Sequence, residues 1–417
     1  MFERLLVLYD QRLVGFLDRE SDRISFTYTP EVVDAQEGRI VLSASLRVRS
    51  RPFTQVEVMP FFSGLLPEGD VRQRLATEFR LDYDDFFGLL RQIGRDCAGA
   101  LSIVPDSTDL QAAAAEGVEW LSDAGLEALV ASMATHPLGV DPGMDIRISL
   151  AGAQSKTVLV IEGQRIGRPR GTTPSTHILK PAPREQFPDL VANESLCMTL
   201  ARAAGLNVCD IEVLKIGEAL ALLVRRYDRG DQSGRVTRVH QEDFCQALRI
   251  PPNRKYQADG GPDLRRMTEL LSRVSADVAS DLDEFVDRVA FNYLIGNADG
   301  HAKNSALVYA PEPRLAPGYD LVSTAVYPEV TRELATSIGG EYRPDQVTTD
   351  HWRREFSRLG LNVQRYSHRL AQLAARVVSA LPQSHAWLAD RGAAAARLSA
   401  VSEIVTDRAK TLAALAG

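Results

Sequence analysis

The sequence of 417 residues has few cysteines and histidines, and it has no long hydrophobic run. Its four cysteines form no Cys-x-x-Cys pair and its seven histidines form no His-Glu-x-x-His motif, which argues against a disulfide framework or a zinc site. The apolar stretch 219–224 is far shorter than the roughly 18 residues of a membrane span. Glu3, Arg4 and Asp10 interrupt what would have to be the apolar core of a signal peptide. We therefore expect a cytoplasmic protein with reduced thiols, in which oxygen ligands hold any metal.

The composition is that of an ordinary globular protein. Hydrophobic residues make up 45% of the chain and charged residues 25%, which excludes the disordered, fibrous and coiled-coil classes. The net charge of −7 excludes a chain that binds nucleic acid along its whole length. At roughly 150 residues per domain, the length predicts two or three domains.

The pattern along the chain changes at three places. Short apolar runs separated by turns (RLLVLYD, RLVGFLD and RISFTYT) predict strands, a helix is expected from about Asp70, and we interpret 1–105 as a β-rich N-terminal module. The polar and small residues of 106–118 predict a linker. Residues 119–240 combine strand patterns with a glycine loop and one helix, as in an α/β nucleotide-binding lobe, whereas 241–417 show mostly helical patterns. The expected fold class is α+β.

The most informative segment is NADGHAKN, from Asn297 to Asn304, which follows an apolar helical pattern and precedes a strand pattern. The interval from Asp299 to Asn304 equals that of the kinase catalytic loop, in which the Asp accepts the hydroxyl proton and the Asn binds magnesium. Asp320, predicted at a strand end, supplies a second carboxylate for such a metal. Asn, Asp and Gly also dominate ordinary surface turns, so the kinase interpretation of this loop depends on other residues of the sequence.

Three further features support the kinase interpretation: a lysine, a carboxylate and a loop of small residues. Lys180 ends the strand pattern THILK and Glu194 lies on the following helix, an order typical of phosphate-binding lysines and their partners; taken singly, both are also ordinary surface residues. The loop 149–156 lies between two strand patterns, so it is no Walker A motif but either a phosphate-binding loop or a plain hairpin turn. Gln241 is expected to begin a helix, where it either contacts the nucleotide or caps the helix.

At these residues the sequence resembles the HipA family of toxin kinases, the kinase half of bacterial toxin–antitoxin pairs. The matching stretches are RISLAGAQSKT, THILKP, the pair Asn193-Glu194, VRRYDR, VHQEDFCQAL, KYQADGGP, NYLIGNADGHAKN and YDL, with FFSGLLPEGD and GRDCAGAL in the N-terminal module. The resemblance implies a protein-kinase-like fold with two lobes, the N-terminal module and a mostly helical C-terminal lobe. It also implies ATP and Mg²⁺ as cofactors.

The resemblance assigns roles residue by residue. Asp299 is the implied catalytic base, Asn304 and Asp320 are the implied magnesium ligands, and Lys180 is implied to hold the nucleotide phosphates. The implied hinge 225–227 departs from the family pattern, because an acidic residue often stands where this chain has Arg225. The implied nucleotide-binding set comprises Ala151, Gly152, Ala153, Gln154, Ser155, Lys156, Lys180, Arg225, Arg226, Tyr227, Gln241, His301, Ala302, Lys303, Asn304, Tyr319 and Asp320.

Ser149 matches the serine that the family autophosphorylates, and a phosphate there would add a charge of about −1.5 to −2 beside the loop that receives ATP. The implied substrate is an aminoacyl-tRNA synthetase, in the first place the glutamate enzyme, whose phosphorylation stops growth and induces dormancy. The implied partner is a HipB-type helix-turn-helix antitoxin, through which the toxin reaches operator DNA as a co-repressor. Two alternatives stay open: a catalytically weak binding protein that completes a repressor complex, and a small-molecule kinase.

Overall fold

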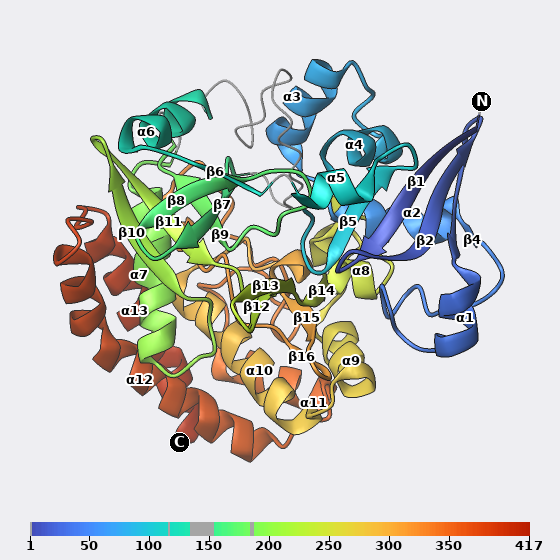
Figure 1. The fold of residues 1–417 in the computed structure, drawn as a ribbon. Helices are drawn as coiled ribbons and strands as arrows, with labels where there is room; N and C mark the ends of the chain where they lie inside the picture. The colour runs from blue at the N-terminus through green and yellow to red at the C-terminus, as the bar shows by residue number, and fades with distance from the viewer. Residues whose placement is uncertain (1, 116, 134–153, 184–186) are drawn as a thin grey trace. The chain divides into compact units, whose positions relative to one another are not determined.

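The computed structural model (Figure 1) describes residues 2–115, 117–133, 154–183 and 187–417. The chain forms two compact units, each assembled from separate stretches of sequence: 1–181, 215–252 and 307–311 form the first, and 182–214, 253–306 and 312–417 form the second. Within the described ranges, no helix combines the length and the apolar character needed to cross a membrane.

The first unit begins with an antiparallel sheet of five strands. Its strands are β1 (Phe2–Tyr9), β2 (Arg12–Glu20), β3 (Arg23–Tyr28), β4 (Phe53–Thr54) and β5 (Leu101–Pro105), in the order β4-β3-β2-β1-β5. The three strands predicted in 1–60 are confirmed, because their apolar residues alternate as strand geometry requires. The aromatic rings of Phe26, Phe53 and Phe62 pack together in the core of this part.

Four helices accompany this sheet: α1 (Pro30–Gln36), α2 (Gln55–Gly64), α3 (Gly69–Phe79) and α4 (Phe86–Ile93). The helix expected from about Asp70 is confirmed as α3, and α4 ends at its C-cap Gly94. The sequence did not predict α1 and α2. Helix α2 begins with a capping box, in which the side chain of Glu57 accepts the amide of Thr54 at 2.8 Å.

The first unit also holds most of a larger sheet in the order β10-β11-β9-β7-β8-β6, in which residues 211–214 of β10 are counted with the second unit. Its strands are β6 (Val118–Trp120), β7 (Thr157–Glu162), β8 (Arg165–Pro169), β9 (His177–Pro181), β10 (Ile211–Ile216) and β11 (Ala219–Arg225), with α5 (Leu110–Ala115) and α6 (Asp123–Ser132) beside them in the sequence. The stretch 106–118, expected to be a linker, therefore contains α5 and the first residue of β6. The boundaries of the predicted domains remain a prediction.

Shorter elements complete the first unit. The strands β12 (Arg229–Gln232) and β13 (Arg235–Arg238) form a hairpin, and β14 (His240–Asp243) pairs with β15 (Ala306–Tyr309). The expectation that Gln241 begins a helix is wrong, because Gln241 lies in β14 and helix α8 (Phe244–Ala247) starts three residues later. The cap is Asp243, whose carboxylate accepts the amide of Gln246 at 2.8 Å.

The second unit is mostly helical, as the sequence predicts. Its helices are α7 (Leu190–Ala203), α9 (Leu264–Val274), α10 (Val278–Ile295), α11 (Thr349–Arg358), α12 (Val363–Ala389) and α13 (Leu398–Ala413). The short strand β16 (Pro313–Leu315) also belongs to this unit. Helix α12 contacts α7, α11 and α13, and α13 also contacts α10. The buried side chains of Tyr293, Trp352 and Phe356 pack in this helical core.

Candidate active site

The loop predicted to be catalytic begins where α10 ends. Gly296 takes a left-handed conformation with φ of +73°, which a glycine adopts without steric cost and which turns the chain out of the helix. The carbonyl of Gly296 accepts the amide of Thr324 at 3.1 Å, and the hydroxyl of Thr324 accepts the amide of Ala298 at 2.8 Å. Thr324 thus holds the start of the loop in place, a role that no sequence motif indicated.

Asp299 is fixed through its backbone and keeps a partly exposed carboxylate. Its amide donates to the side chain of Asn297 at 2.9 Å, and its carbonyl accepts the amide of His301 at 2.8 Å. The side chain is 45% exposed. Oδ1 of Asp299 accepts a hydrogen bond from the hydroxyl of Tyr256, and Nε2 of His301 lies 3.6 Å from the same oxygen. A fixed, accessible carboxylate of this kind suits a general base.

Asn304 lies five residues further on, in the short 3₁₀ helix Ala302–Asn304. Its Nδ2 donates to the carbonyl of Asp299 at 2.8 Å, which fixes the orientation of the amide and leaves Oδ1 as its acceptor atom. Tyr319 donates from its hydroxyl to the carbonyl of Lys303 at 2.8 Å and so ties the segment that contains Asp320 to the loop. His301, Ala302 and Lys303 are buried.

Asp320 was predicted at a strand end, and the structure shows a different backbone setting. The preceding strand, β16, ends at Leu315, so Asp320 does not lie directly at a strand end. It instead adopts a left-handed conformation with φ of +59°, which Asp tolerates better than most residues. Asn304 and Asp320 together offer amide and carboxylate oxygens, the donors that Mg²⁺ prefers when nucleotide phosphates and water complete its coordination. The residues present therefore fit the implied metal.

Asn193 on α7 fixes the chain just after Asp320. Its side chain makes two hydrogen bonds with the backbone of Ser323, donating to the carbonyl at 2.9 Å and accepting the amide at 3.0 Å. Asn193 is fully buried, so both bonds are shielded from water. The neighbouring Glu194 is also buried, at 3% exposure, and is therefore not the solvated helix residue that its type alone would suggest.

The predicted phosphate-binding residues of the first unit lie on or beside the larger sheet. Lys180 is in β9, opposite Leu222 of β11, and Lys156 directly precedes β7; their exposed fractions are 6% and 7%. Buried lysines are rare unless they are paired, which supports a functional or network role for both. Gln154 and Ser155 are half-buried. Ser149, Ala151, Gly152 and Ala153 lie outside the described residues.

The predicted hinge begins at the last residue of β11, and its three residues have different environments. Arg225 is exposed, and burial together with Arg225 lowers the pKa of His177 to about 4. The hydroxyl of Tyr227 donates to the side chain of Gln241. The sequence placed both residues in the nucleotide site, and the structure brings them together within the first unit.

Arg226 was assigned to the nucleotide site, but the structure places its side chain among buried ion pairs. Its guanidinium is buried, donating to Asp228 at 2.7 Å, to Asp96 at 3.3 Å and to the hydroxyl of Ser175 at 2.8 Å. Although burial alone would raise it, the neighbouring arginines hold the pKa of Asp228 at about 2. The side chain of Arg226 is therefore committed to a buried ion network, and its backbone amide donates to the carbonyl of Thr176 at 3.0 Å. The full network comprises Asp96, Ser175, Arg226, Asp228, Arg229 and Arg238.

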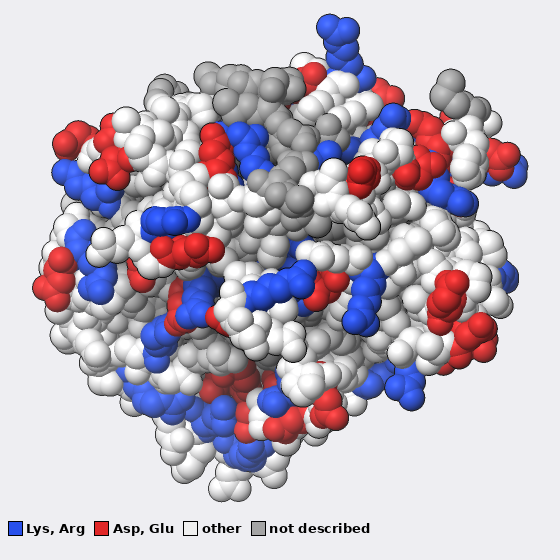
Figure 2. Space-filling model, viewed as in Figure 1, with Lys and Arg blue, Asp and Glu red and all other residues white. Residues whose placement is uncertain are grey.

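Basic and acidic side chains lie next to one another over the face seen in Figure 2. On α12, Arg365 pairs with Asp283 at 2.5 Å and Arg369 with Asp287 at 2.7 Å. These two arginines of the C-terminal helices are thus paired with carboxylates of α10, which argues against their belonging to a free basic surface for DNA.

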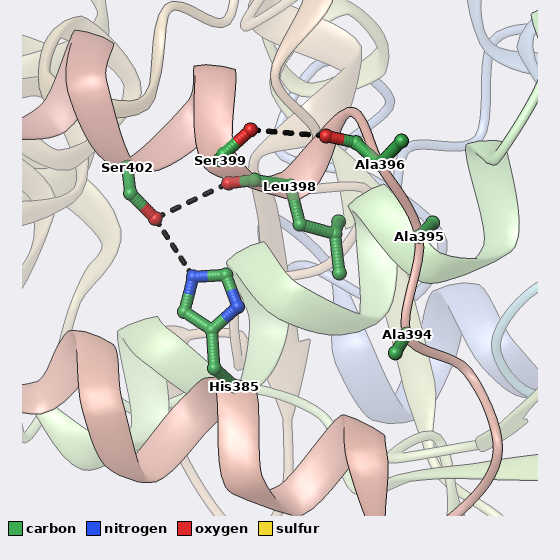
Figure 3. Close-up of a pocket in the computed structure, with 7 residues that line it drawn as sticks. All are labelled: His385, Ala394, Ala395, Ala396, Leu398, Ser399 and Ser402. Atoms are coloured by element: carbon green, nitrogen blue, oxygen red, sulfur yellow. Dashed lines mark hydrogen bonds between the residues drawn. The ribbon is translucent and has the colours of Figure 1, made fainter.

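A hollow lies where the end of α12 meets the start of α13 (Figure 3). Nε2 of His385 and Oγ of Ser402 are 2.7 Å apart there, and Ser402 also donates to the carbonyl of Leu398 at 3.2 Å. None of the residues lining the hollow is a carboxylate that would orient the histidine, so the pair lacks the third group of a nucleophilic triad.

Comparison with known proteins agrees with this geometry. Residues 148–381 match the HipA-like C-terminal domain and residues 5–104 match the HipA N-terminal domain. A putative kinase of Sinorhizobium fredii, Y4mE, is 37% identical over 97% of both chains. The serine/threonine-protein kinase toxin HipA of Shewanella oneidensis is 31% identical, over 88% of this chain and 86% of that one.

The fold of this chain is also similar to that of a solved structure. The HipA of Shewanella oneidensis in complex with HipB and its operator DNA matches with a TM-score of 0.83 and 26% identity, over 97% of this chain and 96% of that one. The expected α+β fold is therefore confirmed. With both domains matched along most of its length, the chain belongs to the HipA family of toxin kinases.

Proposed function

We propose that the protein is a toxin serine/threonine-protein kinase that uses ATP and Mg²⁺. The main support for this proposal is the arrangement of Asp299 and Asn304 in one loop. The carboxylate of Asp299 is partly exposed, and the side chain of Asn304 is oriented by its hydrogen bond to the carbonyl of Asp299. This is the pairing of base and metal ligand that phosphoryl transfer to a hydroxyl requires. Membership of a family of toxin kinases supports the same activity.

The chemistry assigned to these residues is a balanced transfer. The acceptor serine oxygen forms a bond to the γ-phosphorus of ATP, the bond from that phosphorus to the β–γ bridging oxygen breaks, and ADP leaves. The serine proton passes to the carboxylate of Asp299. Bound between Asn304 and Asp320, Mg²⁺ would neutralise charge on the β- and γ-phosphates. We assign phosphate binding to Lys180 and to the loop 151–156, and adenine contacts to the backbone of the hinge 225–227.

The finer parts of the proposal concern substrate, control and partner. We assign an aminoacyl-tRNA synthetase, in the first place the glutamate enzyme, as the substrate, and a cytoplasmic location follows from it. Ser149 is the assigned autophosphorylation site, where added negative charge would repel ATP phosphates. The structural relative was solved with HipB and operator DNA, which supports a helix-turn-helix antitoxin as partner and operator repression through the complex.

The experiment is phosphate transfer from γ-labelled ATP with Mg²⁺ to a panel of purified aminoacyl-tRNA synthetases, with phosphosites mapped by mass spectrometry. The proposal predicts that one synthetase is labelled on serine and that Ser149 of the kinase is labelled as well. The matched control is Ser149→Ala, which should label the synthetase but lose its own mark. A folded protein that binds ATP and labels neither itself nor a synthetase would leave a catalytically weak binding protein as the better account.

A further inference from the structure

Tyr256 contacts the carboxylate that the proposed function makes the catalytic base. Its hydroxyl donates a hydrogen bond to Oδ1 of Asp299, across 43 residues of sequence within the second unit. Its ring also packs edge-to-face against His301, with centroids 5.1 Å apart and an interplanar angle of 82°. Tyr256 therefore contacts the side chains of both Asp299 and His301.

The turn that carries Tyr256 is held from several sides. The amide of Gln257 donates to the carbonyl of Ala335 at 3.0 Å, and the side chain of Gln257 accepts the amide of Ser337 at 2.9 Å. The carbonyl of Tyr256 itself accepts the amide of Gly261 at 2.9 Å. A Cβ on Gly261 would lie 2.4 Å from the carbonyl oxygen of Arg254, so the turn closes more tightly than any other residue type would allow. Such anchoring fixes the direction of the phenol.

The two oxygens of the Asp299 carboxylate consequently differ. Oδ1 has the phenol of Tyr256 as donor and Nε2 of His301 at 3.6 Å. From the residues that the structure describes, no hydrogen bond reaches Oδ2, and 45% of the side chain is exposed. A carboxylate held at one oxygen cannot rotate freely, so its other oxygen keeps a constant direction.

From this arrangement we infer that Tyr256 is a positioning residue for phosphoryl transfer, which holds Asp299 by Oδ1 so that Oδ2 receives the proton of the acceptor hydroxyl. The inference rests on the proposed function, because it needs Asp299 to act as the base. A base oriented by a third group is the general arrangement of activated nucleophiles. In this role Tyr256 does not take the proton itself, so its effect on transfer passes through Asp299.

The test removes only the hydroxyl. Tyr256→Phe keeps the ring that packs on His301, and we expect kcat for transfer to fall about 10- to 100-fold, the size typical of a misdirected catalytic group. The dissociation constant for a non-hydrolysable ATP analogue should stay within twofold of wild type. Tyr342→Phe is the matched control, because the hydroxyl of Tyr342 makes no hydrogen bond with the described residues; it should keep the wild-type kcat.

A double-mutant comparison separates positioning from general damage. In an Asp299→Ala background, Tyr256→Phe should cause no further loss of residual transfer, because the group it positions is gone. An equal loss in both backgrounds, or a weakened ATP analogue in the single variant, would assign Tyr256 a structural role and overturn the inference. Wild-type kcat in Tyr256→Phe would overturn it too, and a faster rate would show that the phenol competes with the acceptor.

The same variants distinguish this inference from the proposed function. If Asp299→Ala transfers phosphate as fast as wild type, Asp299 is not the base, and both the proposed function and the inference fail. If Asp299→Ala is inactive while Tyr256→Phe is unchanged, the proposed function stands and only the role of Tyr256 is lost.

Discussion

The side-chain amide of Asn304 donates a hydrogen bond of 2.8 Å to the backbone carbonyl of Asp299. The two residues that the proposed reaction needs most are therefore fixed to each other by the fold, before any nucleotide is present. The bond uses the nitrogen of the amide and leaves its oxygen as the acceptor atom that we propose binds Mg²⁺. One short loop in this way couples the position of the proposed base to that of the proposed metal ligand.

Replacing Asn304 should remove both the proposed metal ligand and the hydrogen bond to the carbonyl of Asp299. We expect Asn304→Ala to lower kcat at least 100-fold, because a metal ligand and a loop contact are lost together. Raising the Mg²⁺ concentration should recover part of the activity, which a titration of the transfer rate against Mg²⁺ measures. Ser305→Ala, next in the chain and without a described side-chain hydrogen bond, is the control. A variant with unchanged Mg²⁺ dependence would argue against Asn304 as a ligand.

Asn193 offers a test of how the Asp320 segment is supported. Asn193→Ala removes two buried hydrogen bonds to the backbone of Ser323, at a cost of roughly 1–3 kcal/mol. We expect a lower melting temperature and a weaker response of transfer to Mg²⁺. Asn207→Ala, at an exposed position, should change neither quantity. If both variants behave alike, the bonds of Asn193 do not support the site.

The buried network around Arg226 should matter for stability far more than a surface ion pair. Asp96 accepts hydrogen bonds from three buried arginines, so Asp96→Ala leaves buried positive charge uncompensated and should destabilise the protein by about 3–5 kcal/mol. Asp407→Ala, whose partner is the exposed Lys410, should cost no more than about 1 kcal/mol. Urea unfolding of the two variants gives the comparison, and equal losses would contradict it.

Glu242 predicts a pH dependence of stability. It is fully buried, and burial raises its pKa to about 7 despite hydrogen bonds from Ser43, Tyr309 and the amide of Ala44. The unfolded value is about 4.3. Because the folded pKa is the higher one, the folded state binds the proton more tightly, and the resulting stability is full below about pH 4 and lost as the pH rises through 7.

The variant Glu242→Gln mimics the protonated side chain and removes this titration. We expect the melting temperature of wild type, relative to the variant, to fall between pH 5 and pH 8 by several degrees. Other titrating groups are common to both proteins and cancel in the difference. Parallel melting curves across this range would show that Glu242 keeps an ordinary pKa in the folded protein.

Much of the fold was predictable because its signals are local. The alternation in β1 to β3 and the start of α3 near Asp70 were predicted correctly, since a few neighbouring residues determine them. The loop from Asn297 to Asn304 was singled out by the interval between Asp299 and Asn304. It begins directly after the turn that ends α10. Even locally there were errors: the helix expected at Gln241 begins at Phe244, and α2 was missed.

The supporting residues of the site were not predictable from spacing. Tyr256 meets Asp299 across 43 residues, and Asn193 meets Ser323 across 130. Arg226 was assigned to the nucleotide site from its place in the hinge, but its partner Asp96 comes 130 residues earlier and draws the side chain into a buried network. Such pairs depend on tertiary packing, and no periodicity within a single segment records it.

The proposed role of Asp299 as the catalytic base of phosphoryl transfer is best measured by single-turnover transfer from γ-labelled ATP. The acceptor is either the protein's own serine or an accepted synthetase. Wild type and Asp299→Asn should bind the ATP analogue with equal affinity, because the change keeps the size of the side chain. We expect the transfer rate of Asp299→Asn to fall at least 100-fold below that of wild type. Equal transfer rates for the two proteins would contradict it.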